Sequence, residues 1–247
     1  MNTTSQKIIA VVPAAGIGKR MQSQCPKQYL TINNQTILEH TVFKLLSHPL
    51  IEHVVIVISK GDEYFQETSL TSQQNTSVVD GGTERVDSVL AGLLSIDVER
   101  FPWVMVHDAA RPCVDLDDIS ALISKTKQHN CGGLLASPVR DTMKKSQLNN
   151  DTVQVKETVE RENLWHALTP QLYKTTELVL AITKALENSM AITDESSAIE
   201  YAGYKSLLVE GKANNIKITR PEDLSLATFI LSQQLSQKNN FIQVEGK

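Results

Sequence analysis

The chain alternates between short apolar runs and longer stretches with helical periodicity. Residues 8–12 and 53–58 are continuous apolar runs rich in β-branched residues, typical of strands buried on both faces. Between them, the order Thr-Ile-Leu-Glu at residues 36–39 is a capping-box pattern, which predicts the start of a helix. Apolar residues spaced i, i+3, i+4, i+7 and i+8 across residues 86–94 predict a further helix. The pattern therefore indicates strands and helices in alternation.

The rest of the chain continues this alternation, with one interruption. We expect further strands at residues 78–79, 103–106, 134–136, 207–209 and 215–218, and helices at residues 116–123, 175–187 and 194–201. A second capping-box pattern, at residues 219–222, predicts the start of the last helix. The predicted fold is of the α/β class, with a three-layer, Rossmann-like, mostly parallel sheet flanked by helices. Ligands of such sheets bind beyond the carboxyl ends of the strands.

The interruption is a polar segment at residues 140–161. It contains Asn149-Asn150-Asp151 next to an alternating run at residues 152–156, which predicts a β-hairpin arm projecting from the body. The length of 247 residues fits one domain. We therefore expect a single domain over residues 1–247, with the arm as an insertion within it.

Composition and charge narrow the classes of function. The chain is 41% apolar, and 24 basic against 28 acidic residues give a formal net charge of −4, which is ordinary for a globular protein. A mildly acidic chain argues against a nucleic-acid partner but leaves room for a local anion pocket. No apolar run reaches the roughly 20 residues of a membrane span. Three scattered cysteines without a CxxC pair indicate neither a zinc site nor a disulfide framework, and they fit a reducing cytoplasm.

The first candidate site follows the first strand, at residues 13–21. Its small residues and Gly16-Ile17-Gly18 let backbone N–H groups approach an anion, and Arg20 and Lys27 add positive charge, so the segment indicates phosphate binding. Met21 stands where a dinucleotide fingerprint has its third glycine, and the spacing of a Walker A loop is absent. A plain turn between a strand and a helix is the alternative.

Two further clusters follow later strands. At residues 80–88, a Gly-Gly turn leads into the most clearly predicted helix, with Ser88 one turn after its start. The N-terminus of a helix favours anions or the polar edges of bases. A capped helix without a ligand is the alternative. At residues 107–112, Asp108 ends a buried strand, where a carboxylate must be paired or bound to a cation such as Mg²⁺. An ion pair with Arg111 is the alternative there, and we expect His107 to pack and donate or accept hydrogen bonds.

Motifs of other chemistries are absent from the sequence. There is no G-x-S-x-G and no H-E-x-x-H. Nucleotidyl transfer needs neither, because it depends on cations placed where negative charge develops. Arg161 and Lys217 lie in the polar segments 161–171 and 214–219, where single cations are most often solvated, so the residues alone do not assign them.

Several segments together resemble the 2-C-methyl-D-erythritol 4-phosphate cytidylyltransferase family. The resemblance runs from about residue 8 to residue 228. The segments are Ala10–Met21, Cys25–Leu30, Thr36–His40, Val79–Arg85, Val106–Pro112, Pro138–Met143, Leu164–Gln171, Ile192–Glu195 and Asn215–Thr219. The first is typical of a broad nucleotidyltransferase superfamily, whereas Cys-Pro-Lys-Gln-Tyr and Trp-His-Ala-Leu-Thr-Pro-Gln are far more specific.

The resemblance implies that CMP is transferred from CTP to methylerythritol 4-phosphate with Mg²⁺, in the non-mevalonate isoprenoid route. It implies catalytic roles for Arg20, Lys27 and Lys217, and a metal near Asp108. It implies nucleotide contacts for Ala14, Ala15, Gly16, Gly18, Gly82, Thr83, Ser88 and Ala109. It implies acceptor contacts for Arg111, Thr142, Arg161, Thr169 and Lys217.

The resemblance also implies that residues 140–161 are a dimer arm, so that two copies form a homodimer and build the acceptor site together. The nearest competing function is a cytidylyltransferase for ribitol 5-phosphate or another alditol phosphate. A nucleotide-binding regulator without catalysis is a second alternative, which the joint presence of Arg20, Lys27, Asp108 and Lys217 argues against. A dehydrogenase is disfavoured because Met21 breaks the dinucleotide fingerprint.

Overall fold

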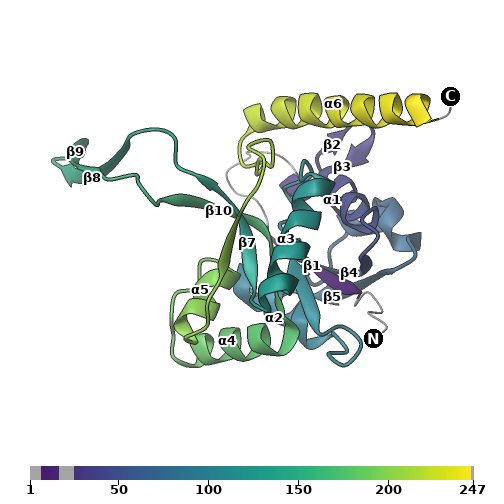
Figure 1. Cartoon of the computed structure of the whole chain (residues 1–247), viewed down its shortest axis with the longest axis horizontal. Helices are drawn as coiled ribbons and strands as arrows, with labels where there is room; N and C mark the ends of the chain where they lie inside the picture. The colour runs from purple at the N-terminus through teal and green to yellow at the C-terminus, as the bar shows by residue number, and fades with distance from the viewer. Residues whose placement is uncertain (1–6, 17–24, 246–247) are drawn as a thin grey trace.

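A seven-stranded mixed sheet forms the centre of the computed structural model, which describes residues 7–16 and 25–245, with side chains of the last helix up to residue 236 (Figure 1). The strand order is β11-β7-β10-β6-β1-β4-β5. The strands are β1 (Ile8–Pro13), β4 (Ile51–Ile58), β5 (Thr76–Asp80), β6 (Trp103–Val106), β7 (Gly133–Pro138), β10 (Trp165–Lys174) and β11 (Leu207–Glu210). All neighbouring pairs are parallel except those of β10, which runs antiparallel to β6 and β7. The α/β class and the mostly parallel sheet are thus confirmed.

Helices cover both faces of the sheet. They are α1 (Ile37–Leu46), α2 (Arg85–Leu94), α3 (Leu116–His129), α4 (Thr175–Glu187), α5 (Glu195–Tyr201) and α6 (Pro221–Glu245). Alternate residues of β1 face opposite layers: Ala10 and Val12 pack with α1 and α3, whereas Ile9 and Val11 pack with α2, α4 and α5. A third apolar cluster joins α6 to the short hairpin of β2 (Thr31–Ile32) and β3 (Gln35–Thr36). These clusters make three layers, as the apolar pattern predicts.

One strand was not expected from the sequence, and one expected strand is wrong. Residues 165–174 form β10, which the sequence did not indicate because its first residues are exposed and its apolar pattern is broken by Thr169, Pro170 and Gln171. Residues 215–218, expected as a strand, join no sheet. Their backbone bonds go to a loop instead, with Ile218 N donating to Ala110 O at 2.9 Å. A strand in which polar residues interrupt the apolar ones gives neither a continuous apolar run nor a period-2 signal.

Of the two capping boxes expected, one is confirmed and one is wrong. Thr36 and Glu39 exchange both bonds at the start of α1, with Thr36 N to Glu39 Oε2 at 2.6 Å and Glu39 N to Thr36 Oγ1 at 3.1 Å. At α6, the acceptor is Asp223 rather than Glu222: its Oδ2 accepts from Thr219 N at 2.8 Å and from Arg220 N at 2.9 Å. The helix begins at Pro221, so the third helical position falls on Asp223.

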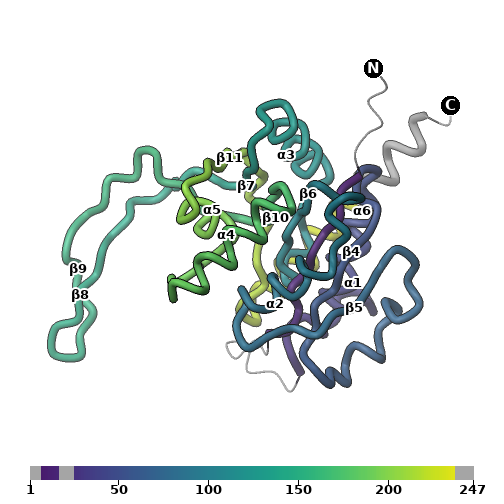
Figure 2. The backbone as a smooth tube through the Cα atoms, turned by 90° about the horizontal axis from the view of Figure 1, so that it is seen from below, coloured from purple at the N-terminus to yellow at the C-terminus, as the bar shows by residue number. Residues whose placement is uncertain are grey.

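The segment between β7 and β10 forms a separate two-stranded hairpin of β8 (Met143–Asn149) and β9 (Thr152–Val159). Figures 1 and 2 show it reaching away from the body in both views. Its side chains are exposed apart from the half-buried Val159, and Leu148 and Val153 each keep 72% of their surface accessible. None of the described helices is long and apolar enough to cross a membrane.

Gly92 allows α2 to lie directly on the sheet. A Cβ at this position would lie 2.7 Å from Val11 Cγ1 and 2.8 Å from Val57 Cγ2. We expect Gly92→Ala to lower the free energy of unfolding by about 1–2 kcal/mol, because overpacking costs about 1–3 kcal/mol while alanine gains about 0.5–1 kcal/mol in a helix. Urea unfolding measures the change. The control is Leu94→Ala on the exposed side of the same helix, expected within about 0.5 kcal/mol of the original protein; equal stability of both variants would contradict the close approach.

Candidate active site

The main pocket lies at the carboxyl ends of β1, β5 and β6, where a doubly wound sheet binds its ligands. Three segments distant in sequence meet there: the loop after β1, the turn before α2 and the loop after β6. The pocket is lined by Pro13, Ala14, Ala15, Gly16, Lys27, Gln28, Gly82, Thr83, Glu84, Arg85, Ser88, Asp108, Ala109, Ala110 and Lys217. Most of the residues expected to bind the nucleotide therefore line one cavity. Gly18 and Arg20 lie outside the described residues.

The loop after β1 is held by hydrogen bonds to its carbonyl groups. Gln28 Nε2 donates to Ala14 O at 2.6 Å, and Ser59 Oγ donates to Ala15 O at 2.7 Å. Ala14 N in turn donates to Val57 O at 2.7 Å, which ties the loop to β4. Gln28 is buried in the 3-10 helix η2 (Lys27–Tyr29). The carbonyl oxygens of Ala14 and Ala15 are thus already occupied, and the path of these two residues is fixed before any ligand binds.

The turn before α2 packs closely against this loop. A Cβ on Gly81 would lie 2.7 Å from Ser88 Oγ and 2.8 Å from Ala15 Cβ, so only glycine fits there. Gly82 N donates to Ser88 Oγ at 3.2 Å, and Ser88 Oγ contacts Glu84 O at 3.2 Å. Ser88 is therefore buried beneath the turn with its hydroxyl at the pocket wall.

The loop after β6 places a buried carboxylate among cations. Asp108 Oδ2 lies 2.7 Å from Lys217 Nζ and 3.6 Å from Arg111 Nε, and Oδ1 lies 3.0 Å from Arg85 Nη2. Burial alone would raise the pKa of Asp108, but the charges of Arg85, Lys217 and Arg111 outweigh it and hold the pKa well below its usual range. Asp108 is therefore ionised, and the ion pair with Arg111 left open by the sequence is present.

Arg85 is a pocket residue that sequence reasoning missed. It is the first residue of α2, and its guanidinium reaches both Asp108 and Glu195, with Nη1 at 2.7 Å from Glu195 Oε1. Burial would lower its pKa, but the charges of Glu195 and Asp108 outweigh this and raise the pKa above its usual value. The only signal in the sequence was its place at the end of the Gly-Gly turn.

Behind Asp108 lies a set of buried hydrogen bonds that includes two of the expected acceptor residues. Thr169 Oγ1 accepts from Asp108 N at 3.0 Å, and Thr169 O accepts from Asn215 Nδ2 at 2.8 Å. Arg111 Nη1 donates to Asn215 O at 2.7 Å. Thr169 and Arg111 are 5% and 8% exposed. Within one chain these two residues support the loop after β6 rather than line the main pocket.

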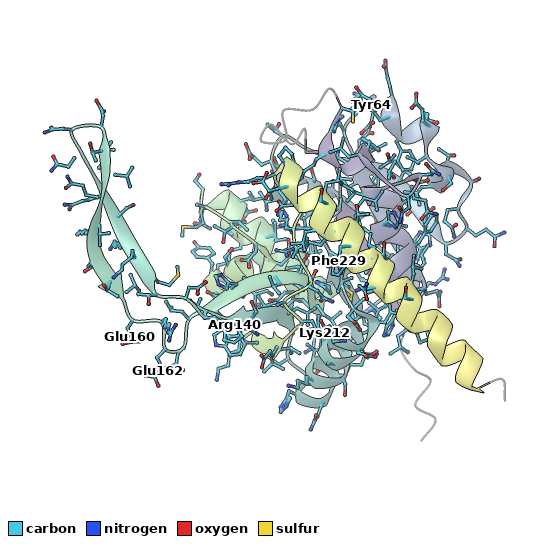
Figure 3. The ribbon with its side chains drawn as sticks, turned by 90° about the horizontal axis from the view of Figure 1, so that it is seen from above. Tyr64, Arg140, Glu160, Glu162, Lys212 and Phe229 are labelled. Carbon is cyan, nitrogen blue, oxygen red and sulfur yellow. The ribbon has the colours of Figure 1, made fainter. Side chains whose placement is uncertain are left out.

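Thr142 and Arg161 lie elsewhere, at the base of the arm. Together with Thr158, Val159 and Glu160 they line a shallow hollow. Arg161 Nη1 donates to Arg140 O, and Figure 3 shows Arg140, Glu160 and Glu162 where the arm leaves the body. A single chain therefore does not bring these two expected acceptor residues into the main pocket.

The residues present fit a metal that is shared with a substrate, not one held by protein ligands alone. Among the described residues there is no group of three or more His, Cys, Asp or Glu side chains that could hold a metal ion. The carboxylates of the described pocket lining are Asp108 and Glu84. Mg²⁺ commonly binds through one or two carboxylates plus substrate phosphates and keeps several waters. Asp108, ionised and at the pocket wall, meets that requirement.

Comparison with known proteins agrees with this geometry. The model of the IspD family, 2-C-methyl-D-erythritol 4-phosphate cytidylyltransferase, matches residues 8–233. The chain belongs to this family. The cytidylyltransferase of Colwellia psychrerythraea is 57% identical over 238 residues, 94% of this chain and 98% of that protein. That of Escherichia coli O7:K1 is 52% identical over 239 residues, 97% of this chain and 100% of that protein.

Solved structures of cytidylyltransferases share the fold. The crystal structure of the Francisella tularensis 2-C-methyl-D-erythritol 4-phosphate cytidylyltransferase has a TM-score of 0.76 and 37% identity, and covers 91% of this chain and 99% of that chain. The enzyme from Thermus thermophilus has a TM-score of 0.74 and 27% identity, covering 91% of this chain and 98% of that chain. The family and the fold suggested by the sequence motifs are therefore confirmed.

His107 is fully buried and neutral, so the stability of this cytidylyltransferase should depend on pH. Its ring nitrogens contact Arg111 O and Thr169 Oγ1, each at 3.0 Å. Since Arg111 O only accepts, Nε2 carries the proton and Nδ1 accepts from the Thr169 hydroxyl. The expectation that His107 packs and forms hydrogen bonds is confirmed. Burial lowers its pKa from 6.5 to about 4.

Between pH 6.5 and 4 the unfolded chain binds a proton at residue 107 that the folded protein excludes, so stability falls as the pH falls. From pH 7.5 to 5 we expect the original protein to lose about 2 kcal/mol more unfolding free energy than His107→Gln, since 1.5 pH units correspond to ~2 kcal/mol. Burial also lowers the pKa values of His48 and His53, but both proteins share them. Urea unfolding at the two pH values measures this; parallel losses would contradict a neutral His107.

Proposed function

We propose that the protein transfers CMP from CTP to 2-C-methyl-D-erythritol 4-phosphate, forming 4-diphosphocytidyl-2-C-methyl-D-erythritol and pyrophosphate in the non-mevalonate isoprenoid pathway. The observation that carries this is the pocket at the carboxyl edge of the sheet, where Lys27, Asp108 and Lys217 face the loops after β1 and before α2. Membership of the cytidylyltransferase family supplies the reaction class. The cations of the pocket fit a polyphosphate nucleotide, although the chain as a whole is acidic.

The transfer is a direct displacement at phosphorus. A phosphate oxygen of the acceptor attacks the α-phosphorus of CTP, and the bond from that phosphorus to the leaving pyrophosphate breaks. Because the attacking group is already an anion, no general base is needed. Negative charge develops on the α-phosphate and on pyrophosphate, where Arg20, Lys27 and Lys217 are proposed to stabilise it. Removal of one such donor commonly costs about 10²–10³ in rate.

The two loops are proposed to bind the nucleotide. Gly82, Thr83 and Ser88 are proposed to contact cytosine, and Ala14, Ala15, Gly16 and Gly18 to contact ribose and phosphates, with Ala109 near the nucleotide. Gln28 and Ser59 hold Ala14 and Ala15, and the turn before α2 packs on Ala15 at Gly81. A site that is fixed before binding loses less entropy when the nucleotide enters.

Asp108 is the residue proposed to hold Mg²⁺ together with phosphates of CTP. The ion would neutralise charge on the phosphates and orient them for displacement. Asp108 contacts Lys217 at 2.7 Å, so the carboxylate also holds the ammonium group close to where the acceptor phosphate must bind.

A homodimer through the arm, residues 140–161, is proposed to complete the acceptor site. A two-stranded hairpin is only marginally stable by itself in water. The apolar side chains of Leu148, Val153 and Val155 are exposed on this arm, and contact with a second subunit would bury them. If each arm reaches the other subunit, Thr142 and Arg161 can approach the partner's pocket, and Arg111 and Thr169 support the same region. A cytoplasmic location is proposed as well, because the sequence has three scattered cysteines and no pattern of a disulfide framework.

The reaction is tested by measuring pyrophosphate release from CTP and Mg²⁺ with two acceptors in parallel. We expect release with methylerythritol 4-phosphate and none with ribitol 5-phosphate. Release with ribitol 5-phosphate alone would keep the fold and the nucleotide site but replace the acceptor. Binding of CTP without release from either acceptor would favour a regulatory function.

The shared acceptor site is tested by mixing inactive subunits. Lys27→Ala subunits mixed with Arg161→Ala subunits should regain activity, because each heterodimer contains one site with both residues intact. With random pairing, about one quarter of all sites are restored. The matched control mixes Lys27→Ala with Lys217→Ala, two residues of the same pocket, and should regain nothing. Equal behaviour of the two mixtures would refute sharing.

A further inference from the structure

Arg85, the first residue of α2, connects the carboxylate of Asp108 in the pocket to α5. No described residue of α5 lines the pocket. The Nε of Arg85 donates to Asp108 Oδ1 at 3.1 Å, and Nη2 lies 3.0 Å from the same oxygen. On its other side, Nη1 and Nη2 donate to the two oxygens of Glu195 at 2.7 and 3.3 Å. Three of the five N–H groups of the guanidinium thereby donate to two carboxylates.

Glu195 is a buried group that the reaction as described above does not use. It is 2% exposed, and its partner Arg85 lies 110 residues earlier in the chain. The adjacent residues of α5 are fastened to β10 through Gln171, whose Nε2 donates to Asp194 Oδ2 and whose Oε1 accepts from Ser196 N, both at 2.9 Å. Glu195 is therefore held by the same strand that carries Thr169, the partner of Asp108 N.

The position of Arg85 raises a chemical problem. An arginine at the wall of a pocket for a nucleoside triphosphate presents a planar fork of donors that matches phosphate oxygens in a bidentate manner. A phosphate caught by that fork would be drawn toward α2, away from Lys27 and Lys217. The bidentate contact with Glu195 occupies the fork and offsets its charge, while the Nε edge remains on Asp108 Oδ1.

We propose that Glu195 and Arg85 are positioning residues of the cytidylyl transfer. Arg85 holds Oδ1 of Asp108, so that Oδ2 faces Lys217, and Glu195 keeps Arg85 on Asp108 and away from the phosphates of the substrate. Neither side chain is a catalytic residue, because both act through Asp108. This inference rests on the proposed function, since it assigns the two residues to that reaction.

The test compares Glu195→Gln, Arg85→Gln and the double variant. In Glu195→Gln the fork is released, so we expect kcat to fall about 10–100-fold while inorganic pyrophosphate binds about tenfold more tightly in calorimetry with Mg²⁺. Arg85→Gln should lower kcat to a similar degree without tighter pyrophosphate binding. The double variant should match Arg85→Gln, because Glu195 acts only through Arg85, rather than show the product of the two losses.

The matched control is Glu200→Gln on the same helix. Glu200 is exposed, its carboxylate accepts from Ser196 Oγ at 2.7 Å, and no contact joins it to Arg85. It should leave kcat and pyrophosphate binding unchanged. Weaker pyrophosphate binding by Glu195→Gln would overturn the proposal, because Glu195 would then not restrain the fork of Arg85. Losses that multiply in the double variant would also overturn it, because the two residues would then act independently.

The design separates folding and the reaction from the positioning role. Circular dichroism melting identifies a variant that does not fold. If Glu195→Gln does not fold, the double variant takes its place, because it removes both charges together. A kcat of the double variant equal to that of the original protein would overturn the proposal. If the original protein releases no pyrophosphate with methylerythritol 4-phosphate, the proposed function fails. Pyrophosphate binding by the variants still tests in that case whether Glu195 restrains Arg85.

Discussion

The burial of one carboxylate, Asp108, is the constraint around which the site is arranged. A buried ionised carboxylate is costly unless it is paired and hydrogen-bonded. Asp108 meets this cost with Arg85, Arg111 and Lys217, which come from the start of α2, from its own loop and from the segment before α6. Because each of these cations belongs to a different segment, their ion pairs with Asp108 also hold the walls of the pocket in place relative to one another.

The antiparallel strand β10 is what makes this arrangement possible. It lies between β6 and β7, beside the loop that carries Asp108, and its own side chains reach in two directions. Thr169 accepts from Asp108 N and contacts His107, while Gln171 fastens α5. The buried polar side chains of Thr169 and Gln171 are tolerated inside the sheet because each of them has hydrogen-bond partners.

The strands of the arm are not held by apolar packing in the way that the strands of the body are. In the body, alternate residues of β1 are buried in two separate apolar layers, so the register of the central strands is strongly determined. The hairpin of β8 and β9 has no layer to pack on within its own chain, and its apolar residues stay exposed. Packing within the chain therefore does not determine the position of the arm.

The sequence by itself determined the central strands β1, β4 and β6, the helices α1 and α2, and the loops that carry the chemistry, because apolar periodicity and glycine turns act over a few residues. It indicated Asp108 and Ser88 for the same reason, since Asp108 follows a strand and Ser88 lies in the first turn of a helix. It indicated Lys27 by its positive charge near the glycine-containing segment.

Only the tertiary structure decided that residues 165–174 form a strand, that residues 215–218 do not, and that Asp223 caps α6. It alone placed Glu195 on Arg85 and Lys217 on Asp108. These pairs join segments far apart in the chain, and they depend on the order in which strands lie side by side. The spacing of residues along the sequence does not reveal the strand order, because the order depends on how all the strands and helices bury their apolar residues together.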